Sequence, residues 1–143
     1  MKPSRRRSRE FAVQSLYQWR VGRNRADDIA RQTAEAEGFG KGDSAYYTRL
    51  FNGTVAQAAS LEAEIAPMLD RRVEELAPIE FVILLLGAFE LKHVPEVPYR
   101  VVINEAVELA KSFGGTDGHK YVNGVLDKLA QRLRVAERTA ERA

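Results

Sequence analysis

The clearest structural pattern in this sequence lies in residues 101–130, VVINEAVELAKSFGGTDGHKYVNGVLDKLA, where two amphipathic segments meet at a Gly-Gly pair. Apolar residues recur there at spacings of three and four, the period of a helix with one buried face. They are Val102, Ala106, Leu109, Ala110 and Phe113 before the pair, and Val122, Val125, Leu126, Leu129 and Leu133 after it. Gly114 and Gly115 can close the first helix in the left-handed conformation, and Thr116 or Asp117 can cap the second. The pattern predicts a helix hairpin with two buried faces.

An apolar run over residues 81–89 predicts the central helix. None of its nine residues has a polar side chain, which also fits a buried strand. We expect a helix over 78–92 because this span gives about four turns. The acids Glu80 and Glu90 flank the run, and no partner strand is recognisable elsewhere. Pro78 suits the first helical position.

The other elements have weaker patterns. We expect helices over 5–22, 27–38 and 43–58, a further helical segment from Ser60 that Pro67 interrupts, and a short helix over 71–76. GFGKG, residues 38–42, should be a flexible loop, and the charged tail after Arg134 should fray. The predicted fold class is all-α. It is a compact bundle of about seven helices in one domain, residues 1–143, with an N-terminal helical half packed on a C-terminal helix bundle.

Composition excludes several classes of protein. The 143 residues include no cysteine, so a disulfide framework, a thiolate zinc site and a cysteine nucleophile are impossible. The N-terminus lacks the apolar core of a secretory signal, and no apolar run approaches the roughly 18 residues of a membrane span. We therefore expect no membrane association and a cytoplasmic location.

The residue types used in catalysis are sparse. The candidates are His93, His119, Asp117, Glu105 and Asp127, and none shows the paired spacing on one helix face that metal sites commonly use. His119 lies two residues after Asp117, which suits a helix cap or a surface contact better. We expect no enzyme activity, no metal and no cofactor.

Positive charge is concentrated at the N-terminus. Residues 1–25 hold eight Lys or Arg against one acid, which leaves 14 basic against 19 acidic side chains in the rest. Arginines neutralise phosphates, and groups such as Tyr17, Tyr121 and Asn123 can stack on or hydrogen-bond to unpaired bases. Each signal has an ordinary alternative: a solvated terminus, tyrosines in the core, or a capped hairpin. The residues alone predict an all-α domain that binds an acidic partner.

Three segments resemble the NusB family of transcription antitermination factors, in the same order and with similar spacing. They are RRRSREFAVQSLYQW, APIEFVILLLGAFEL and VPYRVVINEAVELAKSFGGTDGHKYVNGVLDKLA. The resemblance implies an all-helical, non-enzymatic protein that binds the boxA element of nascent ribosomal RNA. It also implies that NusE, a small-subunit ribosomal protein, binds with it, and that the pair helps to load the antitermination complex on RNA polymerase.

The resemblance also implies roles for individual residues. The RNA-binding set is Lys2, Arg5, Arg6, Arg7, Arg9, Tyr17, Asp117, Gly118, His119, Lys120, Tyr121 and Asn123. Gly118 replaces the usual serine, and Tyr121 stands where phenylalanine is common. The partner-binding set is Glu80, Phe81 and Leu85.

Phe81 and Leu85 depart from the family pattern, because basic side chains are usual at both positions. Either they are buried, or they form an apolar patch that contacts the partner or a second copy of the chain. The second possibility makes a homodimer conceivable.

Two alternative functions stay open. This type of helical domain also occurs as the N-terminal part of ribosomal RNA cytosine methyltransferases, although an end at Ala143 would leave no room for a cofactor domain. The other alternative is a helical scaffold for protein interaction that binds no RNA.

Overall fold

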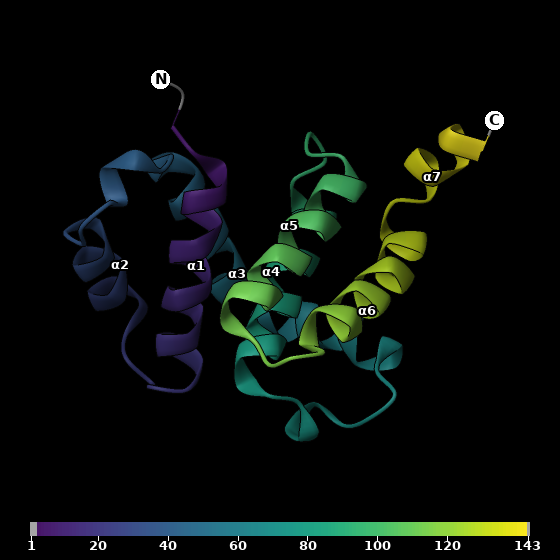
Figure 1. The fold of residues 1–143 in the computed structure, drawn as a ribbon, viewed down its shortest axis with the longest axis horizontal. Coiled ribbons are helices and arrows are strands. Elements are labelled where there is room, and N and C mark those ends of the chain that lie inside the picture. The colour runs from purple at the N-terminus through teal and green to yellow at the C-terminus, as the bar shows by residue number, and fades with distance from the viewer. Residues whose placement is uncertain (1–2, 143) are drawn as a thin grey trace.

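The structure of the chain is a computed structural model that describes residues 3–142, with side chains described for residues 3–140. Its helices are α1 (Arg5–Arg20), α2 (Ala26–Ala34), α3 (Ser44–Ile65), α4 (Pro78–His93), α5 (Tyr99–Phe113), α6 (Gly118–Leu133) and α7 (Val135–Arg142). In Figure 1, α1 and α2 lie at one end of the molecule, α4 and α5 near its centre, and α6 and α7 at the other end. The predicted all-α bundle of about seven helices is confirmed. Within the described residues, no helix has the length and apolarity needed to cross a membrane.

Helix α4 is the central helix, as predicted, because α1, α3, α5 and α6 all pack against it. Every residue from 81 to 91 is buried, with Phe81 only 2% exposed and Leu85 fully enclosed. An apolar helix with neighbours on all sides has no face left for solvent. The expectation that Phe81 and Leu85 form an exposed patch for a partner or a second copy is therefore wrong, and they no longer give a reason to expect a homodimer.

The α5–α6 hairpin is also confirmed, but its corner differs in detail from the prediction. Gly114 has a φ of −97°, so it does not adopt the left-handed conformation. A Cβ at Gly114 would lie 2.8 Å from the carbonyl oxygen of Ala110, and this close approach explains the glycine. Asp117 precedes α6 without a capping bond from its side chain.

Three boundaries differ from the sequence prediction. Helix α3 passes through Ser60 without a break, and the Ser60 hydroxyl donates to the carbonyl oxygen of Gln57 within the helix. The helix expected over 71–76 is only the 3₁₀ turn Val73–Glu75. Helix α2 stops at Ala34, and Gly38, with a φ of +86°, begins the 3₁₀ turn Phe39–Lys41. The prediction that residues 1–143 form one domain stays a prediction.

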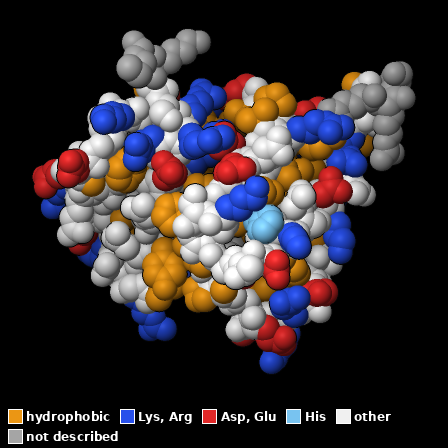
Figure 2. All heavy atoms as spheres, viewed as in Figure 1, with side chains coloured by type: hydrophobic (Ala, Val, Ile, Leu, Met, Phe, Trp, Pro, Cys, Tyr) orange, Lys and Arg blue, Asp and Glu red, His pale blue; other side chains and the backbone are white. Residues whose placement is uncertain are grey.

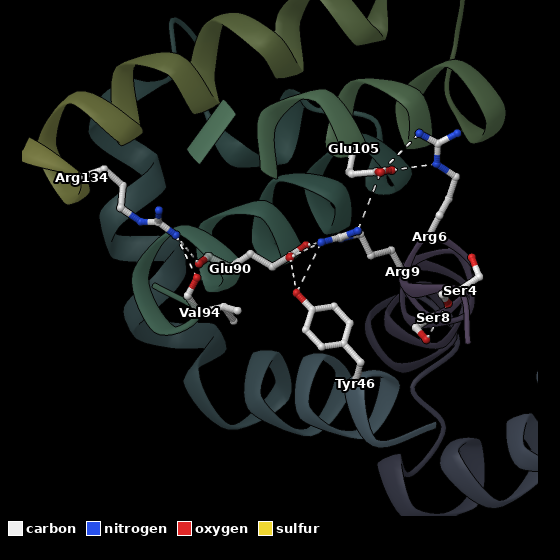
Figure 3. A network of polar contacts seen from close by, with 9 residues as sticks. All are labelled: Ser4, Arg6, Ser8, Arg9, Tyr46, Glu90, Val94, Glu105 and Arg134. Carbon is white, nitrogen blue, oxygen red and sulfur yellow. Dashed lines mark hydrogen bonds and ion pairs between the residues drawn. The ribbon is translucent and has the colours of Figure 1, made fainter. Parts of the chain in front are cut away.

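The charged tail after Arg134 forms helix α7, and bonds from Arg134 hold it to the rest of the protein. This contradicts the expected fraying. The Arg134 guanidinium is buried and donates hydrogen bonds of 2.7–3.1 Å to four backbone carbonyls, at Glu90, Leu91, Val94 and Val97. Glu137 of α7 accepts from Arg134 at 2.6 Å and from the backbone N–H of Tyr99 at 2.9 Å. Arg134 thus adds a donor to the carbonyl groups at and just after the end of α4, where the backbone N–H groups of Val94 and Val97 already bond to the carbonyls of Glu90 and Val94 (Figure 3).

Candidate nucleic-acid interface

The first turn of α1 presents three exposed arginines. Ser4 caps this helix, its hydroxyl accepting from the backbone N–H of Arg7 at 3.1 Å. The Arg5 guanidinium lies over the ring of Tyr46, 4.2 Å from its centroid. Arg6 binds Glu105 through its Nε at 3.0 Å and keeps 61% of its side chain exposed. A hydrogen bond from Arg6 to Glu105, together with the charge of Glu105, raises the pKa of Arg6.

These arginines have the exposure that phosphate contacts require. Figure 2 shows Lys and Arg side chains gathered over the upper part of this face, near the start of α1, with acidic side chains among them. Lys2, the remaining basic residue predicted here, lies outside the described residues.

Arg9 is the exception among the predicted arginines, because it is buried. Only 4% of it is exposed, and its Nε and Nη2 donate to the two carboxylate oxygens of Glu90 at 2.8 and 2.9 Å. The hydroxyl of Tyr46 donates to the same carboxylate at 2.6 Å (Figure 3). Burial alone would lower the pKa of Arg9, but the hydrogen bonds and charge of Glu90 outweigh it and the pKa is raised. Arg9 cannot reach a phosphate from this position, so it is removed from the predicted RNA-binding residues.

Tyr17 lies at a cavity of about 460 Å³ between α1, the start of α4 and the end of α5. Tyr17 is 39% exposed. Gln14, Gln18, Pro78, Ile79 and Phe113 line the cavity with it. Figure 2 shows apolar side chains gathered low in the centre of this face, where α1 ends beside the α5–α6 corner. Aromatic faces next to amide groups can stack a nucleobase and hydrogen-bond its edge.

Three residues that line this cavity, Gln14, Gln18 and Phe113, are not among the site residues predicted from the sequence. Gln14 lies three positions before Tyr17 and four before Gln18, so it neighbours both side chains on the surface of α1. This polar pair beside an aromatic residue was a usable signal. Phe113 was assigned to the buried face of its helix, but the structure leaves it only half-buried.

At the corner, the carboxylate of Glu80 lies against the first residue of α6. Gly118 is buried, and a Cβ added there would overlap Glu80 Oε1. A carboxylate at a helix N-terminus is stabilised by the helix dipole, so Glu80 supplies the negative charge where Asp117 makes no cap. Asp117 instead pairs on the surface with Lys120, at 3.6 Å. The predicted partner-binding acid and the predicted RNA-binding corner are therefore in direct contact.

Tyr121 and Asn123 are not brought together. Side chains two positions apart on a helix point in directions that differ by about 200°. Tyr121 and Asn123 therefore line different cavities. The hydroxyl of Tyr121 donates to Asp70 Oδ1 at 3.0 Å, and the Arg71 guanidinium lies 4.5 Å from its ring centroid. Asn123 lines a cavity between α5, α6 and α7 with Asn104 and Asp127. His119, at the start of α6, is half-buried.

Sequence comparison identifies close relatives. The profile of the NusB family matches residues 6–131. The transcription antitermination protein NusB of Cupriavidus pinatubonensis is 55% identical over 141 residues, which cover 99% of this chain and 84% of that protein. NusB of Nitrosospira multiformis is 60% identical over 129 residues, which cover 90% of this chain and 82% of that protein.

Solved structures share the fold. NusB of T. maritima superposes with a TM-score of 0.81 at 26% identity, covering 92% of this chain and 93% of that one. A NusB solved with NusE and double-stranded RNA gives a TM-score of 0.77 at 22% identity, covering 90% and 96%. Transcription antitermination factors of this kind are non-enzymatic RNA-binding proteins, which confirms the prediction of no enzyme activity. The length and identity of these matches show that the chain belongs to the NusB family.

Proposed function

We propose that this chain is a transcription antitermination factor that binds the boxA element of nascent ribosomal RNA together with NusE. The observation that carries the proposal is the order in which charged, aromatic and polar side chains follow one another along one face of the protein. Exposed arginines stand at the start of α1, the Tyr17 cavity lies near its end, and the α5–α6 corner follows. Arg5 and Tyr17 are 12 positions apart, or roughly 18 Å along the helix. A single strand of several nucleotides can span this distance.

The side chains from the start of α1 to the α5–α6 corner, here called the RNA track, have different roles in recognition. Arg5, Arg6 and Arg7 contact phosphates, which supplies affinity without sequence preference. Tyr17 stacks on a base, and the amides of Gln14 and Gln18 hydrogen-bond to its edge. Such contacts need unpaired bases, so the bound RNA is single-stranded.

Glu80 is the proposed contact for NusE. Its carboxylate lies half-buried beside Gly118 and can pair with a basic side chain of the partner. Phe81 and Leu85 are enclosed in the core and take no part. We further propose that the assembly acts in the cytoplasm, where the pair helps to load the antitermination complex on RNA polymerase.

Fluorescence titration of labelled boxA RNA, with and without NusE, tests this function. We expect binding that tightens when NusE is added and weakens when the boxA sequence is scrambled. Equal affinity for boxA and scrambled RNA, in both the presence and absence of NusE, would contradict the proposal.

Replacing Arg5, Arg6 and Arg7 with alanine should weaken RNA binding for every sequence. Three lost phosphate contacts should lower the slope of log affinity against log salt by roughly two. Thermal melting should change little, because exposed ion pairs contribute at most about 1 kcal/mol. Alanine at Arg25, Arg31 and Arg132 removes the same charge from exposed sites elsewhere and is the control. If both triple variants lose affinity equally, the effect is one of net charge and not of this site.

Glu80→Gln should reduce NusE affinity by more than it reduces stability. Glutamine keeps the shape that fits against Gly118, and the loss of negative charge at the start of α6 should cost about 0.3–1 kcal/mol. The matched control is Glu108→Gln, an exposed acid on α5 that pairs with Lys111 at 3.6 Å. Calorimetric titration with NusE and a urea melt measure the two quantities, and unchanged NusE affinity would remove Glu80 from the interface.

A further inference from the structure

We propose that Tyr46 is a positioning residue for RNA binding: its ring holds the flat face of the Arg5 guanidinium and leaves the N–H donors of Arg5 available to a phosphate. Tyr46 lies on α3, away from the RNA track, and is not among the site residues predicted from the sequence. This inference rests on the proposed function, because it explains how one arginine of the RNA track is held before the RNA binds.

The ring of Tyr46 is fixed in place by the core. Tyr46 is only 3% exposed, and its backbone N–H donates to the capping carboxylate of Asp43 at 3.0 Å. Its hydroxyl donates to the buried carboxylate of Glu90 at 2.6 Å (Figure 3). Burial, followed by the charge of Glu90, raises the pKa of the Tyr46 phenol, so the hydroxyl stays protonated and keeps this bond. The ring is therefore held both at its backbone and at its hydroxyl.

The contact between Arg5 and this ring uses no N–H donor. The guanidinium carbon of Arg5 lies 4.2 Å from the ring centroid of Tyr46, a separation that fits face-to-face stacking of a cation on an aromatic ring. Within the described part of the chain, the Arg5 side chain makes no hydrogen bond or ion pair. The donors of a guanidinium point outward in its plane, whereas stacking uses its flat face. Arg5 can therefore stay on the ring while two of its donors bind a phosphate.

The two neighbouring arginines are contacted through their N–H groups instead. Arg6 donates from Nε and Nη2 to the carboxylate of Glu105 at 3.0 and 3.3 Å, so a phosphate must compete with Glu105 for these donors. Arg7 has a looser contact, with its Nε 3.9 Å from Glu10. Among the contacts of the described residues, only that of Arg5 orders the side chain without using a donor. A side chain ordered in advance loses less entropy on binding, so Arg5 should be the strongest phosphate contact of the three.

A double-mutant cycle with Tyr46→Leu and Arg5→Gln tests the proposal. Leucine keeps the site apolar but offers no aromatic face, so the affinity of the folded variant for boxA RNA should fall roughly twofold to fivefold. In the Arg5→Gln background, Tyr46→Leu should have no further effect, because no guanidinium is left to position. Tyr46→Phe restores the ring without the hydroxyl and should recover most of the affinity that Tyr46→Leu loses.

Tyr47→Leu is the matched control for the loss of a buried tyrosine. Tyr47 is the next residue of α3, is 2% exposed and stacks on Phe51, so its replacement should also lower the melting temperature. It should leave RNA affinity unchanged when both proteins are folded. Affinities are therefore measured at a low temperature at which circular dichroism shows every variant to be folded. Equal losses from Tyr46→Leu with and without Arg5, or no loss at all, would overturn the inference.

NMR of the parent protein gives a second test that does not depend on the folding of any variant. The ring current of Tyr46 should shift the Nε–H proton signal of Arg5 upfield in the free protein, and the shift should persist when boxA RNA is bound. Loss of the shift on addition of RNA would mean that Arg5 leaves the ring to reach the phosphate, which would also overturn the inference.

The proposed function is tested separately. A parent protein that binds boxA and scrambled RNA equally would contradict the proposed function itself. Specific binding of boxA by the parent, without coupling between Tyr46 and Arg5, would overturn only the role of Tyr46.

Discussion

Arg9→Ala is expected to destabilise the protein by about 3–5 kcal/mol, the cost of leaving one member of a buried ion pair without its partner. Glu90 would keep its charge in the core, with only the hydroxyl of Tyr46 still bonded to it. Arg6→Ala, one turn earlier and exposed, should cost less than about 1 kcal/mol. Urea denaturation of the two variants measures the difference.

A triple replacement separates the charge from the packing. Arg9→Met, Glu90→Met and Tyr46→Phe together remove the buried ion pair and the hydroxyl bonded to it, and the set should cost less than Arg9→Ala alone, since neither charge of this pair remains. The RNA affinity of folded Arg9→Ala, measured at low temperature, should match that of the parent. A stable Arg9→Ala protein that has lost RNA affinity would instead show that Arg9 reaches the RNA.

Arg134→Ala is expected to cost roughly 3–5 kcal/mol, because the carbonyl groups of Leu91 and Val97 lose the donor that Arg134 supplies and those of Glu90 and Val94 keep only a backbone donor. The affected carbonyls follow α4 or lie in its last turn, so the loop that leads into α5 loses its anchor. Glu137 also loses its bond to Arg134, which weakens the docking of α7. The stability of Arg134→Lys should fall between that of the parent protein and that of Arg134→Ala, since one ammonium group cannot reach as many carbonyls as a guanidinium.

Arg132→Ala is the control for this prediction, because Arg132 is exposed and should change stability by no more than about 0.5 kcal/mol. Urea midpoints give the free energies, and hydrogen exchange at the Tyr99 amide reports the contact with Glu137. Equal stability of Arg134→Ala and Arg132→Ala would mean that the tail frays, as its composition alone suggests.

One helical turn separates two roles for arginine in α1. Arg6 lies on the outside of the bundle, whereas Arg9 points inward to Glu90 and Tyr46 (Figure 3). Arg5 is also exposed. The arginine cluster therefore both presents charge to a ligand and holds α1 to α3 and α4. Mutagenesis of the whole cluster would mix the two effects, and the separate variants above avoid this.

The sequence by itself determined the helices and the family. Helical periodicity predicted α4, α5 and α6 because their apolar spacing is a local property of consecutive residues. The three segments that resemble the NusB family lie in α1, α4, α5 and α6, and this resemblance carried the prediction of function. The positive charge of the N-terminus was likewise readable without coordinates.

Only the tertiary structure decided which side chains face solvent. Phe81 and Leu85 are core residues because four helices surround α4, and Arg9 is internal because α3 and α4 supply its partners. Tyr121 and Asn123 separate because α6 has different neighbours on its two sides. Arg134 orders the tail because its carbonyl partners come from residues about 40 positions earlier in the chain. Each of these outcomes depends on contacts between distant segments, and local spacing carries no information about which helix will cover a given face.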